Sequence, residues 1–138
     1  MKLLRIILFF TFITSNLFAK TNYFNEGLVF FKKNELEKAK FKFEQDLVFN
    51  PKSEKSYLYL SKIYNYQKKK KLEEKNLNSV ILLNPKNEEA IYNLASLKLD
   101  NSDYKESKKL VEQLLVFCKD YCKKSKNLQI KIENSIKK

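Results

Sequence analysis

A spacing of 34 residues relates successive parts of this chain. The tripeptide Asn50-Pro51-Lys52 recurs as Asn84-Pro85-Lys86, and each copy follows an apolar run. The same offset relates four further columns: Tyr23, Tyr57 and Ile91; the small residues Gly27, Ser61 and Ala95; Phe43, Leu77 and Val111; and Leu47, Ile81 and Leu115. A fixed period of this length is the signature of a repeat architecture, in which copies of one small unit stack on their neighbours.

Each unit contains two apolar stripes of helical period with a short polar turn between them. In the first unit, Tyr23, Gly27 and Phe30 share one helix face, and Leu36, Ala39, Phe43 and Leu47 share a face of the next. Lys33-Asn34 forms the turn between them. Pro51 and Pro85 end the second helices, because proline lacks the backbone donor and restricts the residue before it. With one Gly and two Pro in 138 residues, the chain lacks the turns of a β-sandwich or barrel.

These residues resemble the tetratricopeptide repeat (TPR), whose helix-turn-helix unit is 34 residues long. The first unit matches the repeat best, at Tyr23, Gly27, Phe30, Ala39, Phe43 and Pro51. The second unit has Ser61 for Gly, Glu73 for Ala and Leu77 for Phe. In the third, Lys98 replaces an aromatic and Lys119 replaces the closing proline, which indicates that the array stops there. The resemblance implies an all-α fold, an α-solenoid of three TPR-like repeats at about residues 20–52, 53–86 and 87–119, and the small column should mark the closest approach of paired helices.

Residues 120–138 are rich in lysine but keep Tyr121, Leu128, Ile132 and Ile136 on roughly one helical face. A helix here would cap the apolar edge of the last repeat, as terminal repeats require. A disordered basic tail is the competing interpretation.

The first 19 residues have the layout of a secretory signal peptide. Lys2 and Arg5 precede an apolar stretch from Ile6 to Ile13, and Ala19 offers a small residue before a cleavage point. The apolar stretch is too short for a membrane-spanning helix. We therefore expect export to a bacterial periplasm or cell envelope, with a mature chain that begins at Lys20. An uncleaved anchor is the alternative.

The charge and the missing residue types exclude several classes of function. The chain has 28 Lys and Arg against 16 Asp and Glu, a net charge of +12, and no His. Without His, most hydrolase and metalloenzyme chemistries are disfavoured, so we expect no enzyme, no metal and no cofactor. Because Arg5 is the only arginine, nucleic acid is a poor candidate partner. The lysine excess leaves three explanations open: a compositional bias, an anionic membrane surface or an acidic partner. The run Lys68–Lys71 is expected at a solvated turn.

Cys118 and Cys122 are four residues apart, with no second cysteine pair to complete a structural zinc site. A disulfide is chemically possible in an exported protein, and a break in the helix between the two residues would relieve its strain. Two free, largely buried thiols are the alternative.

In the TPR family the first helix of each repeat lines a concave groove. The resemblance assigns to this groove side chains that point away from the interhelical core: Phe24, Leu28, Phe31, Lys55, Leu58, Tyr59, Lys62, Tyr66, Tyr92, Asn93 and Ser96. Such an apolar face suits an amphipathic helix or extended peptide with some acidic character. It does not match the lysine and asparagine set with which chaperone-binding members clamp a terminal carboxylate. Self-association or irregular packing would also explain the apolar residues.

Together these features predict an exported protein-binding adaptor or assembly scaffold that presents its groove to a peptide or helix of a partner protein. The alternative is a peripheral envelope protein held on anionic lipid, or on an acidic partner, by its lysines.

Overall fold

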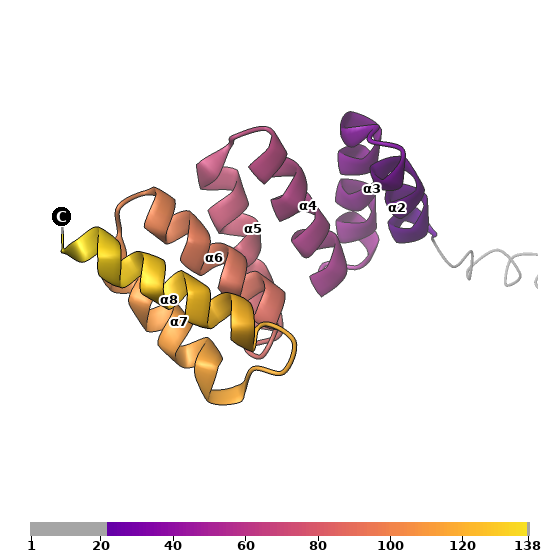
Figure 1. The fold of residues 1–138 in the computed structure, drawn as a ribbon. Helices are drawn as coiled ribbons and strands as arrows, with labels where there is room; N and C mark the ends of the chain where they lie inside the picture. The colour runs from indigo at the N-terminus through magenta and orange to yellow at the C-terminus, as the bar shows by residue number, and fades with distance from the viewer. Residues whose placement is uncertain (1–21, 138) are drawn as a thin grey trace, which may run out of the picture.

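The computed structural model describes residues 22–137 of the chain (Figure 1). The secondary structure of this part consists of seven α-helices: α2 (Tyr23–Lys32), α3 (Leu36–Phe49), α4 (Glu54–Tyr66), α5 (Lys70–Leu83), α6 (Glu88–Asp100), α7 (Tyr104–Phe117) and α8 (Cys122–Ile136). Consecutive helices pack as antiparallel neighbours, and the resulting hairpins follow one another along a stack. The predicted all-α solenoid of three helix-turn-helix repeats with a capping helix is confirmed.

The helix boundaries keep the 34-residue period. The second helices begin at Leu36, Lys70 and Tyr104, and α4, α6 and α8 begin at Glu54, Glu88 and Cys122. α8 therefore stands where a further first helix would stand, and it packs against α6 and α7. The last complete repeat ends with α7, as expected from the missing proline near Lys119, and α7 is followed by Cys118 with an extended ψ of 150°. The expected unit boundaries, after residues 52, 86 and 119, fall in the turns that follow α3, α5 and α7.

Each hairpin turn places one residue in the left-handed region. Asn34, Lys68 and Ser102, one period apart, have φ angles of 60°, 56° and 60°. In each turn, the backbone N–H of the following residue donates a hydrogen bond to the carbonyl five residues earlier. In the second turn, for example, Lys69 N donates to Tyr64 O at 2.9 Å. This geometry favours glycine and is tolerated by asparagine. Its conformational cost is therefore larger for Lys68 and Ser102 than for Asn34.

The first hairpin closes tightly because residue 27 is glycine. A Cβ added to Gly27 would lie 2.6 Å from Cε1 of Phe43, closer than such atoms can pack. The prediction that this column marks a close helix approach is confirmed for Gly27. One period later the corresponding pair is Ser61 and Leu77, and two periods later it is Ala95 and Val111. All four residues are at most 2% exposed. A larger residue in the first helix thus accompanies a smaller one in the second, which keeps the interior filled without overlap.

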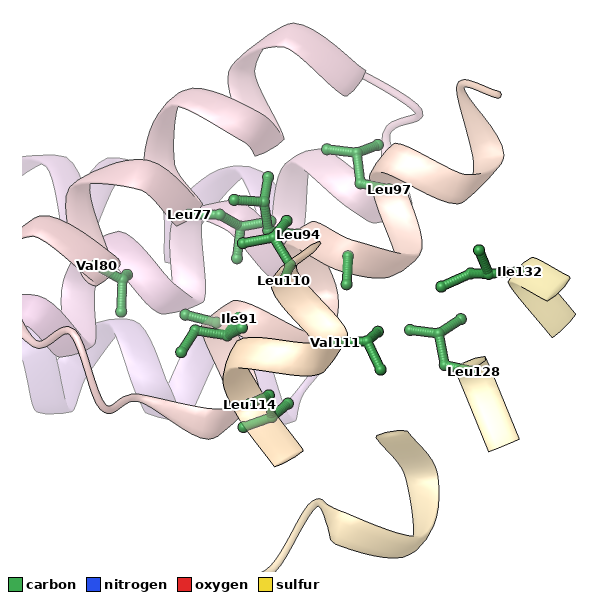
Figure 2. Close-up of a cluster of buried hydrophobic side chains, with 12 residues drawn as sticks. Leu77, Val80, Ile91, Leu94, Leu97, Leu110, Val111, Leu114, Leu128 and Ile132 are labelled. Atoms are coloured by element: carbon green, nitrogen blue, oxygen red, sulfur yellow. The ribbon is translucent and has the colours of Figure 1, made fainter. Parts of the chain in front are cut away.

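Buried apolar side chains form two clusters of different character. The smaller one consists of Ala39, Phe43, Leu60 and Ile63, with half-buried aromatic rings from α2 and α4 packed around it. The larger one is mostly aliphatic and runs from α5 to α8 (Figure 2). Its members are Leu77, Val80, Ala90, Ile91, Leu94, Ala95, Leu97, Leu110, Val111, Leu114, Leu128 and Ile132. The capping helix contributes Leu128 and Ile132, so it belongs to the larger core and is not an appended tail.

Carboxylates hold the turns between successive repeats. In the turn after α3, Asp46 accepts hydrogen bonds from Asn50 Nδ2 at 2.9 Å and from the Ser56 hydroxyl. Burial alone would raise the pKa of Asp46, but hydrogen bonds from Ser53, Ser56 and Asn50 bring this pKa below its ordinary value. The ionised carboxylate therefore stabilises this turn.

The next two turns are held from the first residue of a first helix. Glu54 accepts hydrogen bonds from the side-chain amides of Asn84 and Asn87, which follow α5. One period later, Glu88 accepts three backbone N–H groups after α7: Lys119 at 2.7 Å, Asp120 at 3.0 Å and Tyr121 at 2.9 Å. Each of these two carboxylates ties its own repeat to the turn that leads into the following helix.

Cys118 and Cys122 form a disulfide, with their Cα atoms 5.3 Å apart. Cys118 is the residue after α7 and Cys122 is the first residue of α8, so the two do not share one straight helix. The bridge closes the turn that Glu88 also holds.

The predicted signal peptide, residues 1–19, lies outside the described residues. Between residues 22 and 137, no helix combines the length and apolar character needed to cross a membrane.

Candidate functional site

The first helices α4 and α6 enclose an open hollow of about 410 Å³. Its floor includes Ser61 and the buried Glu73 of α5, and one flank is closed by Phe31 of α2. The remaining lining residues come from α4 and α6: Lys62, Asn65, Tyr66, Glu89, Asn93, Ser96, Leu97 and Asp100. The lining comes from helices of all three repeats, and we call this feature the α4–α6 hollow.

Five of the eleven groove residues predicted from the resemblance line this hollow: Phe31, Lys62, Tyr66, Asn93 and Ser96. The other six do not: Phe24, Leu28, Lys55, Leu58, Tyr59 and Tyr92. Lys55 is exposed at the start of α4, where its Nζ lies 5.9 Å from the centre of the Phe24 ring. Leu58 packs against the larger core cluster.

The expectation that the groove aromatics point away from the interhelical core is wrong for Phe24 of α2 and Tyr59 of α4. Tyr59 is the centre of a ring cluster, with ring centroids 5.1 Å from Phe31, 5.3 Å from Phe43 and 5.8 Å from Phe24. Phe24 also meets the fully buried Phe43, at 5.7 Å. These rings, with Leu28, pack against the smaller core cluster. Their apolar surface joins the first repeat to the second, as the interpretation of irregular packing anticipated.

Tyr92 is covered in a different way. Its ring lies 5.4 Å from the ring of Tyr121, in the turn before α8. Both residues pack against the larger core cluster. Tyr92 therefore belongs to the contact between α6 and the turn that leads into the capping helix.

The hollow is more acidic than the sequence suggested. It contains the carboxylates of Glu73, Glu89 and Asp100 and one ammonium group, that of Lys62. Lys62 Nζ pairs with Glu89 at 2.8 Å and lies 4.7 Å from the centre of the Tyr59 ring. Because this lysine is already paired, the hollow offers less attraction to an acidic peptide than the predicted lysine rim would.

Glu73 is the most unusual group in the hollow. Its residue is only 4% exposed, and Asn65 Nδ2 donates to its Oε1 at 3.0 Å. Burial raises the pKa of Glu73 above its ordinary 4.5, nearby Asp100 adds to the rise, and the hydrogen bond from Asn65 works against it. The equivalent residues of the other repeats are the small, buried Ala39 and Ser107. A glutamate in a column of small residues was the sequence signal for this site, and it was visible as a departure from the repeat.

All four lysines of the run Lys68–Lys71 are exposed, as expected for a solvated turn. Lys68 and Lys69 lie in the turn before α5, whereas Lys70 and Lys71 begin the helix. Lys70 Nζ donates to Asn101 Oδ1 at 2.7 Å and so links this turn to the next hairpin turn.

In residues 22–137 no three His, Cys, Asp or Glu side chains come together in a way that could hold a metal ion.

No protein-family model matches the chain, and no curated protein matches it either. Among solved structures, it resembles the first TPR of Spaghetti (RPAP3) bound to the HSP90 peptide SRMEEVD, at 18% identity and a TM-score of 0.76, over 84% of this chain and 91% of that one. It also resembles the Sgt2 TPR domain from Aspergillus fumigatus, at 19% identity and a TM-score of 0.73, over 88% of this chain and 84% of that one.

A third similar structure is the Yersinia enterocolitica type III secretion translocator chaperone SycD. The identity is 11% and the TM-score 0.79, over 93% of this chain and 94% of that one. At these identities the likeness concerns the fold. With the period, the hairpins and the capping helix, it shows that the chain has a TPR-like fold.

Proposed function

We propose that this protein is an exported, non-enzymatic adaptor that binds a peptide or helix of a partner protein in the α4–α6 hollow. Structurally similar TPR domains support a binding role, since one of them is bound to a peptide. The observation that carries the proposal is the hollow itself. It is open to solvent, and it gathers aromatic, amide, hydroxyl and charged side chains from α2, α4, α5 and α6.

The lining favours particular ligand chemistry. Phe31 and Tyr66 lie with ring centroids 6.2 Å apart on one flank, and Tyr66 is 65% exposed, so an apolar or cationic side chain can pack there. Asn93 and Ser96 of α6 supply polar groups on the opposite flank. The aromatic flank would anchor the ligand and the polar flank would orient it.

The charges argue against a strongly acidic ligand. SRMEEVD, the peptide bound to the Spaghetti (RPAP3) domain, ends in an acidic stretch. The lining of this hollow contains three carboxylates and a single lysine, which is paired with Glu89. We therefore infer a neutral or basic peptide, which revises the acidic character expected from the sequence.

Tyr66→Ala tests this site with little risk to the fold, because Tyr66 is largely exposed. Crosslinking from position 66 in the native cell would identify a partner, and titration of that purified partner would then give its Kd. We expect Tyr66→Ala to weaken binding about tenfold or more, as for a central aromatic anchor. Phe41→Ala is the matched control, since Phe41 is 57% exposed on α3 and remote from the hollow. Equal affinities of wild type and Tyr66→Ala for the partner would show that the partner does not bind in the α4–α6 hollow.

Export rests on residues 1–19 alone. We propose cleavage after Ala19, because this small residue follows a short apolar stretch with a basic start. N-terminal sequencing of the native protein should begin at Lys20. Recovery of Met1 from a membrane fraction would instead support an uncleaved anchor.

A further inference from the structure

One column of the repeat remains outside both cores. Val48, Leu82 and Val116 are one period apart and are 76%, 83% and 86% exposed, more than any other large apolar side chain of residues 22–137. Each is the residue before the last in its helix, α3, α5 or α7. Neither core cluster nor the α4–α6 hollow includes them. Intramolecular packing therefore does not explain why all three repeats have an apolar residue at this position.

Lysines accompany this column. The turns that follow α3, α5 and α7 lie toward the same side of the stack, the lower side in Figure 1. They carry Lys52, Lys86 and Lys119, which are exposed and whose side chains make no ion pair within the described residues. We call Val48, Lys52, Leu82, Lys86, Val116 and Lys119 the turn edge.

The carboxylates near the turn edge are mostly engaged with the protein. Asp46, Glu54 and Glu88 accept hydrogen bonds from the turns themselves. Asp120 is the exposed carboxylate that remains in the third of these turns. The outward charge of the edge is consequently positive, in a chain whose net charge is +12.

We propose that the turn edge docks on the surface of an anionic lipid membrane. Val48, Leu82 and Val116 would enter the interfacial layer, while the adjacent lysines would meet anionic headgroups. Charge complementarity favours this occupant. The spacing does too, because single apolar tips set one repeat apart suit a fluid surface, whereas protein partners usually recognise apolar residues that cluster at the centre of an interface.

The surface is distinct from the proposed peptide site. At the opposite edge, the third hairpin carries two carboxylates: Asp100 at the end of α6 and Asp103 at the start of α7. A chain bound through the turn edge would leave the α4–α6 hollow accessible, so membrane docking and peptide binding can fail independently.

Tryptophan fluorescence gives a local test in the full chain, because the sequence contains no tryptophan. In the Leu82→Trp variant, emission should shift to shorter wavelength with vesicles of phosphatidylglycerol and phosphatidylcholine, and brominated lipid should quench it. Vesicles of phosphatidylcholine alone should leave it unchanged. Phe41→Trp is the control, since position 41 is exposed on α3 away from the edge. Because the probe is local, insertion of the apolar N-terminal segment would not imitate this signal.

Vesicle co-sedimentation tests the charges. Replacing Lys52, Lys86 and Lys119 with Ser should weaken binding to the anionic vesicles roughly a hundredfold, at about fivefold for each lysine near the surface. The control replaces Lys33, Lys71 and Lys105, three exposed lysines elsewhere, and removes the same net charge. Its loss should be much smaller. Circular dichroism melting should be unchanged in both triple variants.

Two results would overturn the proposal. Equal losses in the two triple variants, or no spectral shift at position 82, would show binding by diffuse charge without docking of this edge. A shift that depends on protein concentration in the absence of lipid, together with a dimer in analytical ultracentrifugation, would show that a second copy covers the edge.

Discussion

The two ends of this solenoid fill their interiors differently. From α2 to α4, four buried residues are surrounded by half-buried rings, and Phe43 and Tyr59 touch each other and Phe24. From α5 to α8, twelve mainly aliphatic residues form a continuous core. The same 34-residue unit can therefore be stabilised by a few large rings or by many small side chains. The ring-based end depends more heavily on each individual residue.

Phe43→Ala should have the largest effect, because it removes the one large ring that is fully buried in the smaller cluster. We expect a loss of about 3 to 5 kcal/mol in the free energy of unfolding, measured by urea denaturation. The same column in the third repeat provides the control, Val111→Ala, which should cost about 2 kcal/mol. Hydrogen exchange should show α2–α4 losing protection before α6–α8 in Phe43→Ala. A uniform loss along the chain would mean that the two ends do not differ in this way.

Gly27→Ala should come next, at about 1 to 3 kcal/mol, because the added Cβ meets the Phe43 ring. Phe43→Leu should reduce this penalty, since the second repeat already combines Ser61 with Leu77. A double-mutant cycle monitored by thermal unfolding measures the coupling. Additive effects of the two changes would contradict the close contact.

Glu73→Gln tests the effect of a buried carboxyl group in the α4–α5 hairpin, which contributes side chains to both core clusters. Since the folded pKa of Glu73 is raised, the native state binds this proton more tightly than the unfolded state does. Its contribution to stability is thus greatest at pH below about 4.5 and is lost as the pH rises through the folded pKa. We expect Glu73→Gln to be more stable than wild type by about 1 to 2 kcal/mol at pH 7.

The advantage of Glu73→Gln should shrink toward zero below pH 4, where the carboxyl group is protonated in both states. Melting temperatures of both proteins across this pH range provide the measurement. Glu133→Gln, at an exposed residue of α8, controls for the general loss of one negative charge. A variant that is less stable at pH 7 would indicate that the ionised form of Glu73 is the one the fold prefers.

The smallest effect should come from the hairpin turns. Lys68→Gly should stabilise the protein by about 0.5 to 1 kcal/mol, because it relieves a left-handed conformation in a residue with a Cβ. Asn34→Gly should change stability by a few tenths of a kcal/mol or less, since Asn tolerates this region. Comparable gains at both positions would show that the identity of the residue does not determine the cost of these turns.

The fold could be predicted from the sequence because repetition makes each weak signal count two or three times. The small column at Gly27, the closing Pro51 and the two helical stripes all recur at one offset. The capping helix was less certain, because a single amphipathic stripe rich in lysine can also remain unfolded. The structure shows it in the position of a first helix, anchored by Leu128 and Ile132.

The site was harder to predict because the register identifies the face of a helix but not what covers that face. Phe24 and Tyr59 lie on the predicted side of their helices, yet neighbouring rings from the adjacent repeat enclose them. Glu89 and Asp100 were missed because their role depends on α4 and α6 facing each other across the hollow. Contacts between repeats are not encoded in the period of one repeat.

The matched pairs Gly27 with Phe43, Ser61 with Leu77 and Ala95 with Val111 also determine how such a chain can be rearranged. A graft of α4 in place of α2 would set the Ser61 side chain against the Phe43 ring, where even one added carbon is too close. The unit that can be duplicated, deleted or exchanged is therefore the whole hairpin, in which both partners of the pair travel together. In protein engineering, recombination points should accordingly fall in the turns after α3 and α5, and not in the turns within a hairpin.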